Sequence, residues 1–309
     1  MDFQYIGRLA MPHFRRFKTE SEITTLQFMA EQTTIPAPEV YAWDADPDNS
    51  AGAENILLKK IPGERPSDRW EGFSEDEKKR VIGQLVDIQL QFLHTTFDKV
   101  VSLFKNTDND SYEVGILVDQ LLYLGTHGKM KIGPTEEYLI GLLRSTSTFL
   151  DRPDALNDDD CDERHIDRIR NACQRPEEAI PTIPSFQPMD ASPERFCLQH
   201  TGLHMVEGTK VTGIIESEEA GVYPAWVFGE SHSLVSGPDV IDDGVHREGY
   251  YREEHLWLLE KTKYRHFFHS EINGRDQEFK AVVEEAGELV RCKVYTTLSG
   301  TFQGTLCAG

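Results

Sequence analysis

The first 62 residues combine strand-like and helix-like segments on a scale too small to enclose a core of their own. Residues 5–10 are short and apolar enough for a strand, and residues 40–43 and 55–61 predict two more strands around a turn rich in Asp, Pro and Asn. A helix is expected between the first strand and the second. Because so small a layer buries too little surface to be stable alone, it must pack against the rest of the chain. The sequence therefore predicts a small mixed layer of strands and a helix that leans on the rest of the chain.

That first helix carries the pattern of a capping box. Thr19 is the expected N-cap residue, and Glu22 follows three positions later. Ile23, Leu26 and Met29 then recur at helical spacing, so one face of the helix is expected to pack on other elements.

From residue 74 onward the pattern is mainly helical. Ser74 and Glu77 form a second capping box, and the apolar residues that follow them line one helix face: Val81, Ile82, Leu85, Ile88 and Phe92. Further helices are predicted over residues 136–150, 246–268 and 276–295, and short strands over 196–198 and 211–215. The acidic run at 157–160 has no apolar residues framing it, so we interpret it as a solvated loop rather than a metal site.

Composition and charge exclude several classes of function. The net charge of −21 argues against nucleic-acid binding, which needs a basic surface, and suits either a cationic substrate or an acidic solvated surface. Five widely spaced cysteines without a CxxC pair predict reduced thiols rather than a zinc site or a disulfide framework. No stretch approaches the roughly 20 apolar residues of a membrane span, and the N-terminus lacks the pattern of a secretory signal. We therefore expect a cytoplasmic protein, or a mitochondrial one if a presequence is missing from this chain.

Five segments in a fixed order resemble a known family. They are KTESE (18–22), TTIPAPEVY (33–41), ILLKKIPG (56–63), FCLQHTGLH (196–204) and VTGII (211–215). Their order and spacing resemble the aminoglycoside phosphotransferase and choline-kinase-like family, in particular its fungal members, over about residues 5–270. Each segment is weakly specific alone, and the order of all five carries the resemblance.

The resemblance implies a two-lobed, protein-kinase-like α+β fold. Residues 1–62 would form an incomplete β-rich N-lobe, residues 63–272 a large, mostly helical C-lobe with a remnant of the catalytic loop, and residues 273–309 a C-terminal helix and tail. ATP with Mg²⁺ would lie between the lobes, and the hydroxyl of an unknown small molecule would accept the γ-phosphoryl group.

The resemblance also assigns the phosphate clamp. Arg8 falls at the position of the phosphate-gripping cation, and Glu22 at the position of its helix partner. Arginine in place of lysine is not a conservative change at a tight site. The alternative is that Arg8 is a surface arginine and Glu22 only a capping residue. The Gly-rich loop that covers the phosphates in the family would lie before Tyr5, and this chain lacks it.

The catalytic loop departs from the family pattern. His200 matches a structural histidine, whereas Gly202 stands at the position of the general base and offers no side chain to accept a proton. The Asn ligand of the metal is also missing, either replaced by Glu207 or lost in a deletion that ends at the turn formed by residues 208–210. Losing a general base typically lowers the rate by about 10²- to 10⁴-fold.

Carboxylates near the end of the 211–215 strand complete the predicted site. Glu216 replaces the metal-binding aspartate, while Glu218 and Glu219 are interpreted as a solvated helix start. A zinc site built from His200, His204 and Glu207 is a further possibility on a helix, although Gly202 and the preceding strand favour a loop there.

Three functional hypotheses remain open. The first is a phosphotransferase-family protein that is inactive or severely impaired, and the second is a pseudokinase that binds a nucleotide or a protein partner. The third is an active small-molecule kinase in which His204 or Glu216 replaces the missing base. None of them involves nucleic acid or a membrane.

Overall fold

The computed structural model describes residues 4–11, 14–106, 108–119, 135–150, 167, 196–199, 203–218, 220–229, 234–242, 244 and 248–285 of the chain. Its strands are β1 (Tyr5–Leu9), β2 (Val40–Asp44), β3 (Asn55–Lys59), β4 (Thr96–Phe97), β5 (Leu103–Lys105), β6 (Tyr112–Val114), β7 (Phe196–Gln199), β8 (Leu203–Glu207), β9 (Lys210–Ile215) and β10 (Gly221–Pro224). Its α-helices are α1 (Phe17–Gln32), α2 (Pro66–Arg69), α3 (Glu75–His94), α5 (Thr135–Leu150), α7 (Tyr250–Arg275) and α8 (Gln277–Glu285), and two 3₁₀ helices span Trp70–Gly72 and Ala225–Gly229.

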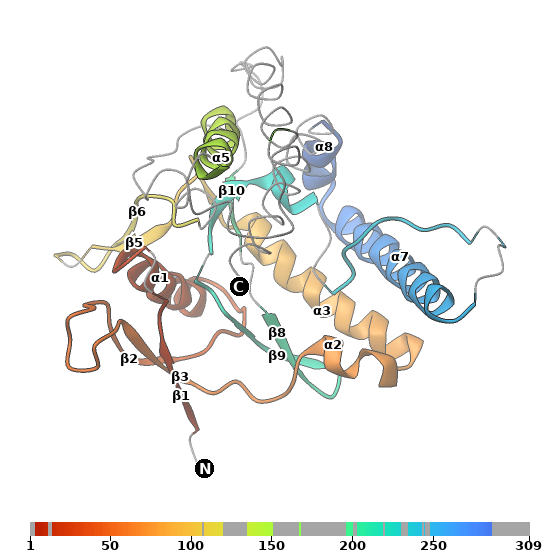
Figure 1. Ribbon diagram of the computed structural model, residues 1–309, viewed down its shortest axis with the longest axis horizontal. Helices are drawn as coiled ribbons and strands as arrows, with labels where there is room; N and C mark the ends of the chain where they lie inside the picture. The colour runs from red at the N-terminus through yellow and green to blue at the C-terminus, as the bar shows by residue number, and fades with distance from the viewer. Residues whose placement is uncertain are drawn as a thin grey trace.

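The small lobe is an antiparallel sheet with one helix beside it. Its strand order is β1-β3-β2, with Arg8 opposite Ile56 and Trp43 opposite the same residue on the other edge. In Figure 1 α1 lies beside this sheet. The three predicted strands are confirmed.

The predicted start of α1 is wrong. The helix begins at Phe17, its N-cap residue is Arg16, and no side chain caps it. Thr19 therefore lies in the first turn, where its hydroxyl donates a 2.6 Å hydrogen bond to Glu54 Oε2. Glu22 pairs with Arg8 instead of the N-terminal backbone. Partners distant in the sequence have replaced the local capping box.

A hairpin of β8 and β9 joins the small lobe to the large one. Ile214 N donates to Pro36 O at 2.9 Å. Val206 exchanges two backbone hydrogen bonds with Glu64, which lies in the segment between β3 and α2. Gly63 has a φ of 107°, and a Cβ added there would lie 2.3 Å from Val206 O. Only glycine fits this close approach, so the connection between the lobes is held tightly against β8.

Helix α3 forms the centre of the large lobe. Its predicted capping box is confirmed, because Ser74 Oγ accepts from Glu77 N while Ser74 N donates to Glu77 Oε2 at 2.8 Å. The five apolar residues predicted on one face, from Val81 to Phe92, are all buried. Helix α7 packs along α3 (Figure 1). It begins four residues later than predicted and continues to Arg275.

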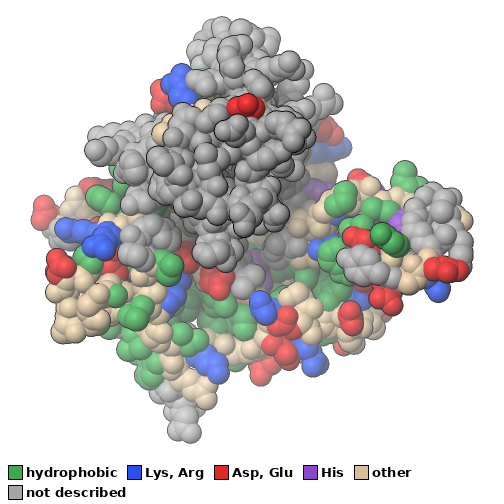
Figure 2. Space-filling model, viewed as in Figure 1, with side chains coloured by type: hydrophobic (Ala, Val, Ile, Leu, Met, Phe, Trp, Pro, Cys, Tyr) green, Lys and Arg blue, Asp and Glu red, His purple; other side chains and the backbone are tan. Residues whose placement is uncertain are grey.

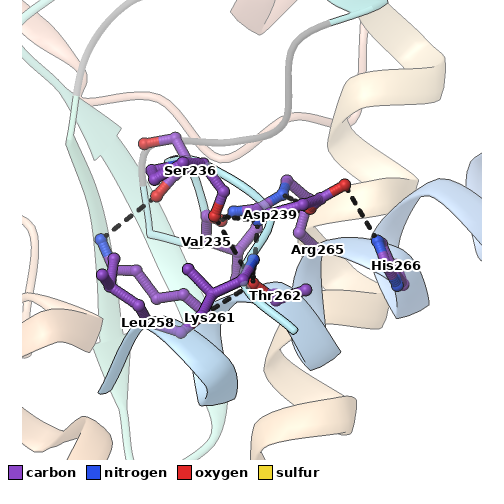
Figure 3. Close-up of polar contacts among 10 residues, drawn as sticks. Val235, Ser236, Asp239, Leu258, Lys261, Thr262, Arg265 and His266 are labelled. Carbon is purple, nitrogen blue, oxygen red and sulfur yellow. Dashed lines mark hydrogen bonds and ion pairs between the residues drawn. The ribbon is translucent and has the colours of Figure 1, made fainter. Parts of the chain in front are cut away.

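A nearly buried arginine attaches residues 234–242 to α7. Arg265 Nη1 donates to Val235 O at 2.8 Å, Nη2 donates to Pro238 O at 2.7 Å, and the guanidinium also pairs with Asp239. Figure 3 shows these contacts, together with the ion pair between Asp239 and His266. Arg265 and His266 hold the pKa of Asp239 below its usual range. The segment is thus fixed by charge as well as by packing.

The whole has the predicted two-lobed α+β organisation, with a small sheet-and-helix lobe and a large, mainly helical lobe. Where Figure 2 draws the described residues in colour, acidic and basic side chains are intermixed over the visible face. None of the described helices combines the length and the apolar character needed to cross a membrane.

Candidate charged site between the lobes

Helix α1 buries polar side chains on several of its faces. Lys18, Thr19, Ser21, Glu22, Thr24 and Thr25 are all buried, although they occupy the first nine positions of the helix. Burying so many polar groups lowers stability unless each has a partner. This arrangement marks the N-terminal half of α1 as the candidate site.

Arg8 and Glu22 form an ion pair between β1 and α1. The Glu22 side chain is 2% exposed, whereas a quarter of the Arg8 side chain remains in contact with solvent. Burial raises the pKa of Glu22, and the nearby charge of Arg8 opposes this effect without overcoming it. The structure thus brings together the two predicted clamp residues, while their role in nucleotide binding remains a prediction.

A second ion pair, which the sequence did not reveal, lies one turn away on α1. Lys18 Nζ lies 2.9 Å from Glu218 Oε2, and only 2% of the Lys18 side chain is exposed. Lys18 and Glu22 are four residues apart and therefore lie on the same side of the helix. The two pairs place two cations and two carboxylates at the junction of β1, α1 and the segment after β9.

The interpretation of Glu218 as a solvated residue is wrong. Its side chain is half-buried and its carboxylate contacts the lysine of α1. Glu216, the predicted metal ligand, is exposed instead and has a φ of 64°, while Ser217 between them is buried. A left-handed backbone is uncommon for a residue other than glycine. This turn separates the two glutamates, and only Glu218 reaches α1.

Two residues of the predicted catalytic loop, His200 and Gly202, lie outside the described residues. Residues after them form strand β8, although the sequence was interpreted as a loop there. His204 is buried and lies opposite Ile214. Because this segment is a strand rather than a helix, the helical spacing that suggested a zinc site does not apply. Among the described residues, no three His, Cys, Asp or Glu side chains converge as metal ligands.

A half-open pocket of about 370 Å³ lies at the start of α1, and none of its lining residues belongs to the two ion pairs. Phe17 and residues of the β5–β6 hairpin line it, and Lys99 is its only charged lining residue. Its walls are mainly apolar, so it offers few of the donors that a polyphosphate needs.

Sequence reasoning missed Lys18 and Glu218 because each resembles a solvated surface charge. A usable signal was present, since Lys18, Glu22 and Thr25 recur at helical spacing on one face. A polar face at these positions, on a helix expected to pack on other elements, indicates charges that are buried rather than solvated.

No protein-family model matches the sequence. The subtelomeric hrmA-associated cluster protein of Aspergillus fumigatus is 31% identical over 104 residues, which cover 33% of this chain and 20% of the relative. Altered inheritance of mitochondria protein 9, mitochondrial, of Candida tropicalis is 29% identical over 131 residues, which cover 39% of this chain and 20% of the relative. The chain thus spans about a fifth of the length of these curated relatives. The cytoplasmic location expected from the sequence gains no support from their names.

Solved structures match over more of the chain at lower identity. An apo form of a thermostable mutant of aminoglycoside phosphotransferase APH(4)-Ia covers 96% of this chain and 86% of its own, with 11% identity and a TM-score of 0.47. A GDP complex of aminoglycoside 2'-phosphotransferase-IIIa covers 96% and 94%, with 14% identity and a TM-score of 0.43. The fungal relatives thus match about a third of the sequence, and the solved structures align with nearly the whole chain at low identity.

Proposed function

We propose that the chain binds an adenine nucleotide between its lobes and belongs functionally to kinase-like phosphotransferases whose transfer step is severely impaired. The observation that carries this proposal is the ion pair between Arg8 on β1 and the buried Glu22 on α1. It joins the sheet to the helix at the position that the sequence resemblance assigns to the phosphate clamp.

Arg8 has the chemistry required of a phosphate ligand. Its guanidinium is permanently charged and presents several N–H donors in a plane that matches phosphate oxygens. Glu22 fixes one side of this group, while the exposed quarter of the side chain leaves another part accessible. The nucleotide would supply the transferable phosphoryl group, and Arg8 would hold and partly neutralise the phosphates.

Magnesium fits the described residues less well than phosphate does. The carboxylate of Glu218 already contacts the ammonium of Lys18, and that of Glu22 contacts Arg8. Glu216 is exposed two residues before Glu218, and its backbone is left-handed. The two buried or half-buried carboxylates of the cluster are therefore already paired with cations of the protein itself.

The impaired transfer step follows from the sequence of the catalytic loop. Gly202 cannot accept the proton of an attacking hydroxyl, and the loss of a general base lowers rates by about 10²- to 10⁴-fold. The hydroxyl substrate itself is left unassigned.

Calorimetric titration of the full chain with ATP tests nucleotide binding. We expect saturable binding that weakens about tenfold in Arg8→Met, a loss of ~1.4 kcal/mol. The matched control is Arg69→Met, because Arg69 is an exposed arginine that pairs with Glu64. A folded wild-type chain that does not bind ATP, or Arg8→Met binding as tightly as wild type, would contradict the proposal.

Turnover tests the impairment separately. We expect phosphoryl transfer from ATP to small alcohols to stay near the uncatalysed background in the wild-type chain and to rise in Gly202→Asp. Rapid turnover by the wild-type chain would show that another group replaces the base.

We also propose a mitochondrial location, supported by the name of the Candida tropicalis relative. Imaging of the full-length protein carrying a C-terminal fluorescent tag tests this, and purely cytosolic fluorescence would contradict it.

A further inference from the structure

We propose that this site binds nucleotide without magnesium, because the ammonium group of Lys18 already neutralises the carboxylate of Glu218 in the segment after β9. This inference rests on the proposed nucleotide binding and specifies how the site balances the charge of the phosphates.

The position of Lys18 provides the first argument. Its ammonium lies 2.9 Å from Glu218 Oε2, and the side chain is almost fully buried. An ammonium is a compact charge with three donors, so it can occupy one face of a carboxylate as a cation does. Magnesium needs oxygen ligands at about 2.0–2.1 Å in octahedral geometry, so it could not share that carboxylate face with the ammonium.

The surrounding charges provide the second argument. Arg8 and Lys18 carry two positive charges, and Glu22 and Glu218 balance them when ionised. A divalent ion placed beside Lys18 would meet a like charge in a partly buried setting, where repulsion is stronger than in bulk water. The cluster is therefore already compensated, and a metal ion would gain little from it.

Removal of Lys18 should reverse this balance. In Lys18→Met the carboxylate of Glu218 would lose the ammonium that lies 2.9 Å from it, and the added negative charge of the cluster would repel the phosphates of a free nucleotide. Magnesium would then relieve that repulsion. The affinity of the wild-type chain for ATP should thus be the same with and without magnesium, whereas that of Lys18→Met should depend on magnesium.

The experiment is calorimetric titration of the full chain with ATP in EDTA and again in excess magnesium. For the wild type we expect dissociation constants within about twofold of each other. For Lys18→Met we expect binding about tenfold weaker in EDTA, a difference of ~1.4 kcal/mol, and recovery when magnesium is added.

Three variants test the cause. Lys59→Met removes a lysine from β3 that is 43% exposed, and should behave as wild type. The double variant Lys18→Met with Glu218→Gln removes both charges, and its affinity for ATP should again be the same with and without magnesium. Glu218→Gln alone keeps the buried lysine, so it tests the inference even if Lys18→Met fails to fold, and it should bind ATP in EDTA at least as tightly as wild type.

The outcomes separate the two proposals. Wild-type binding that appears only with magnesium would overturn this inference and leave the proposed function standing, as would a magnesium requirement in Glu218→Gln. A folded wild-type chain that binds ATP in neither condition would overturn both.

Discussion

Helices α1 and α3 are both buried, but different forces hold them in place. In α3 the buried face is almost entirely apolar, with Lys78 as its one buried charged residue. In α1 six of the nine buried residues are polar or charged and lie in the first nine positions. Burial alone therefore does not identify a structural helix, because the chemistry of the buried face decides what the helix can do.

The partners of the two helices differ in the same way. The first turn of α3 is completed by its own N-cap, Ser74, and by Glu77 three residues later. The polar groups of α1 instead meet β1 through Arg8, the start of β3 through Glu54, and the segment after β9 through Glu218. The position of α1 thus depends on polar and charged groups from three other segments, whose ionisation varies with pH.

The largest expected effect comes from the core face of α3. Phe92→Ala removes a buried ring and should lower the free energy of unfolding by about 3–5 kcal/mol. Urea denaturation followed by circular dichroism measures it. On the same helix, the side chain of Gln84 makes hydrogen bonds to the β8–β9 hairpin. Gln84→Ala removes these bonds rather than a buried ring and should lower stability by less. Equal losses in the two variants would break the assignment of α3 as an apolar structural helix.

On α1 a single hydroxyl should have an effect out of proportion to its size. Thr19→Val keeps the shape of the side chain but removes the hydrogen bond to the buried carboxylate of Glu54, which should lower stability by about 1–3 kcal/mol. Thr24→Val is the matched control, since that hydroxyl only donates back to Glu20 O within the helix. A smaller loss for Thr19 than for Thr24 would argue against a polar core beneath α1.

The two helices should also respond to pH with opposite sign. Because the pKa of Glu22 is raised in the folded state, the folded protein releases the Glu22 proton at a higher pH than the unfolded protein does. The free energy of unfolding of the wild type should therefore fall relative to that of Glu22→Gln as the pH rises above about 4.5. The slope should be at most ~1.4 kcal/mol per pH unit. Lys263 and Lys79 lower the pKa of Glu75 in α3 to about 2. Relative to Glu75→Gln, wild-type stability should therefore rise with pH between about 2 and 4.5. Denaturant titrations at a series of pH values test both slopes, and slopes of the same sign would break the contrast.

Most of the fold could be predicted because its signals are local. The capping box and apolar face of α3 interact within a few turns of one helix, so the sequence pattern identifies them. The hairpin of β5 and β6 was missed because its strands are only three residues long. Strand β8 was missed because the segment was read through its resemblance to a loop, although its turn at residues 208–209 is a hairpin signal.

The site was harder to predict because its contacts are distant in sequence. Thr19 and Glu22 have the spacing of a capping box, yet they bond to residues 35 and 14 positions away. Local spacing cannot show that a tertiary partner will compete for the same side chain. Arg8 and Glu22 were found only through the family resemblance, whereas the Lys18–Glu218 pair required the packing of α1 on the segment after β9.

The smallest expected effect has the opposite sign and lies on the same helix. The hydroxyl of Thr25 is buried without a hydrogen-bond partner, and Thr25→Val replaces it with a methyl group of the same shape. Because burying an unpaired hydroxyl is unfavourable, we expect a gain in stability of roughly 0.5–1 kcal/mol, measured by urea denaturation beside Thr19→Val. The two substitutions are chemically identical and six residues apart on α1. A loss of stability at Thr19 with a gain at Thr25 would show that α1 tolerates apolar replacement wherever no distant partner uses the polar group. A loss at both positions would mean that the Thr25 hydroxyl also has a partner in solution. The polar interior of α1 would then extend further than the ion pairs alone.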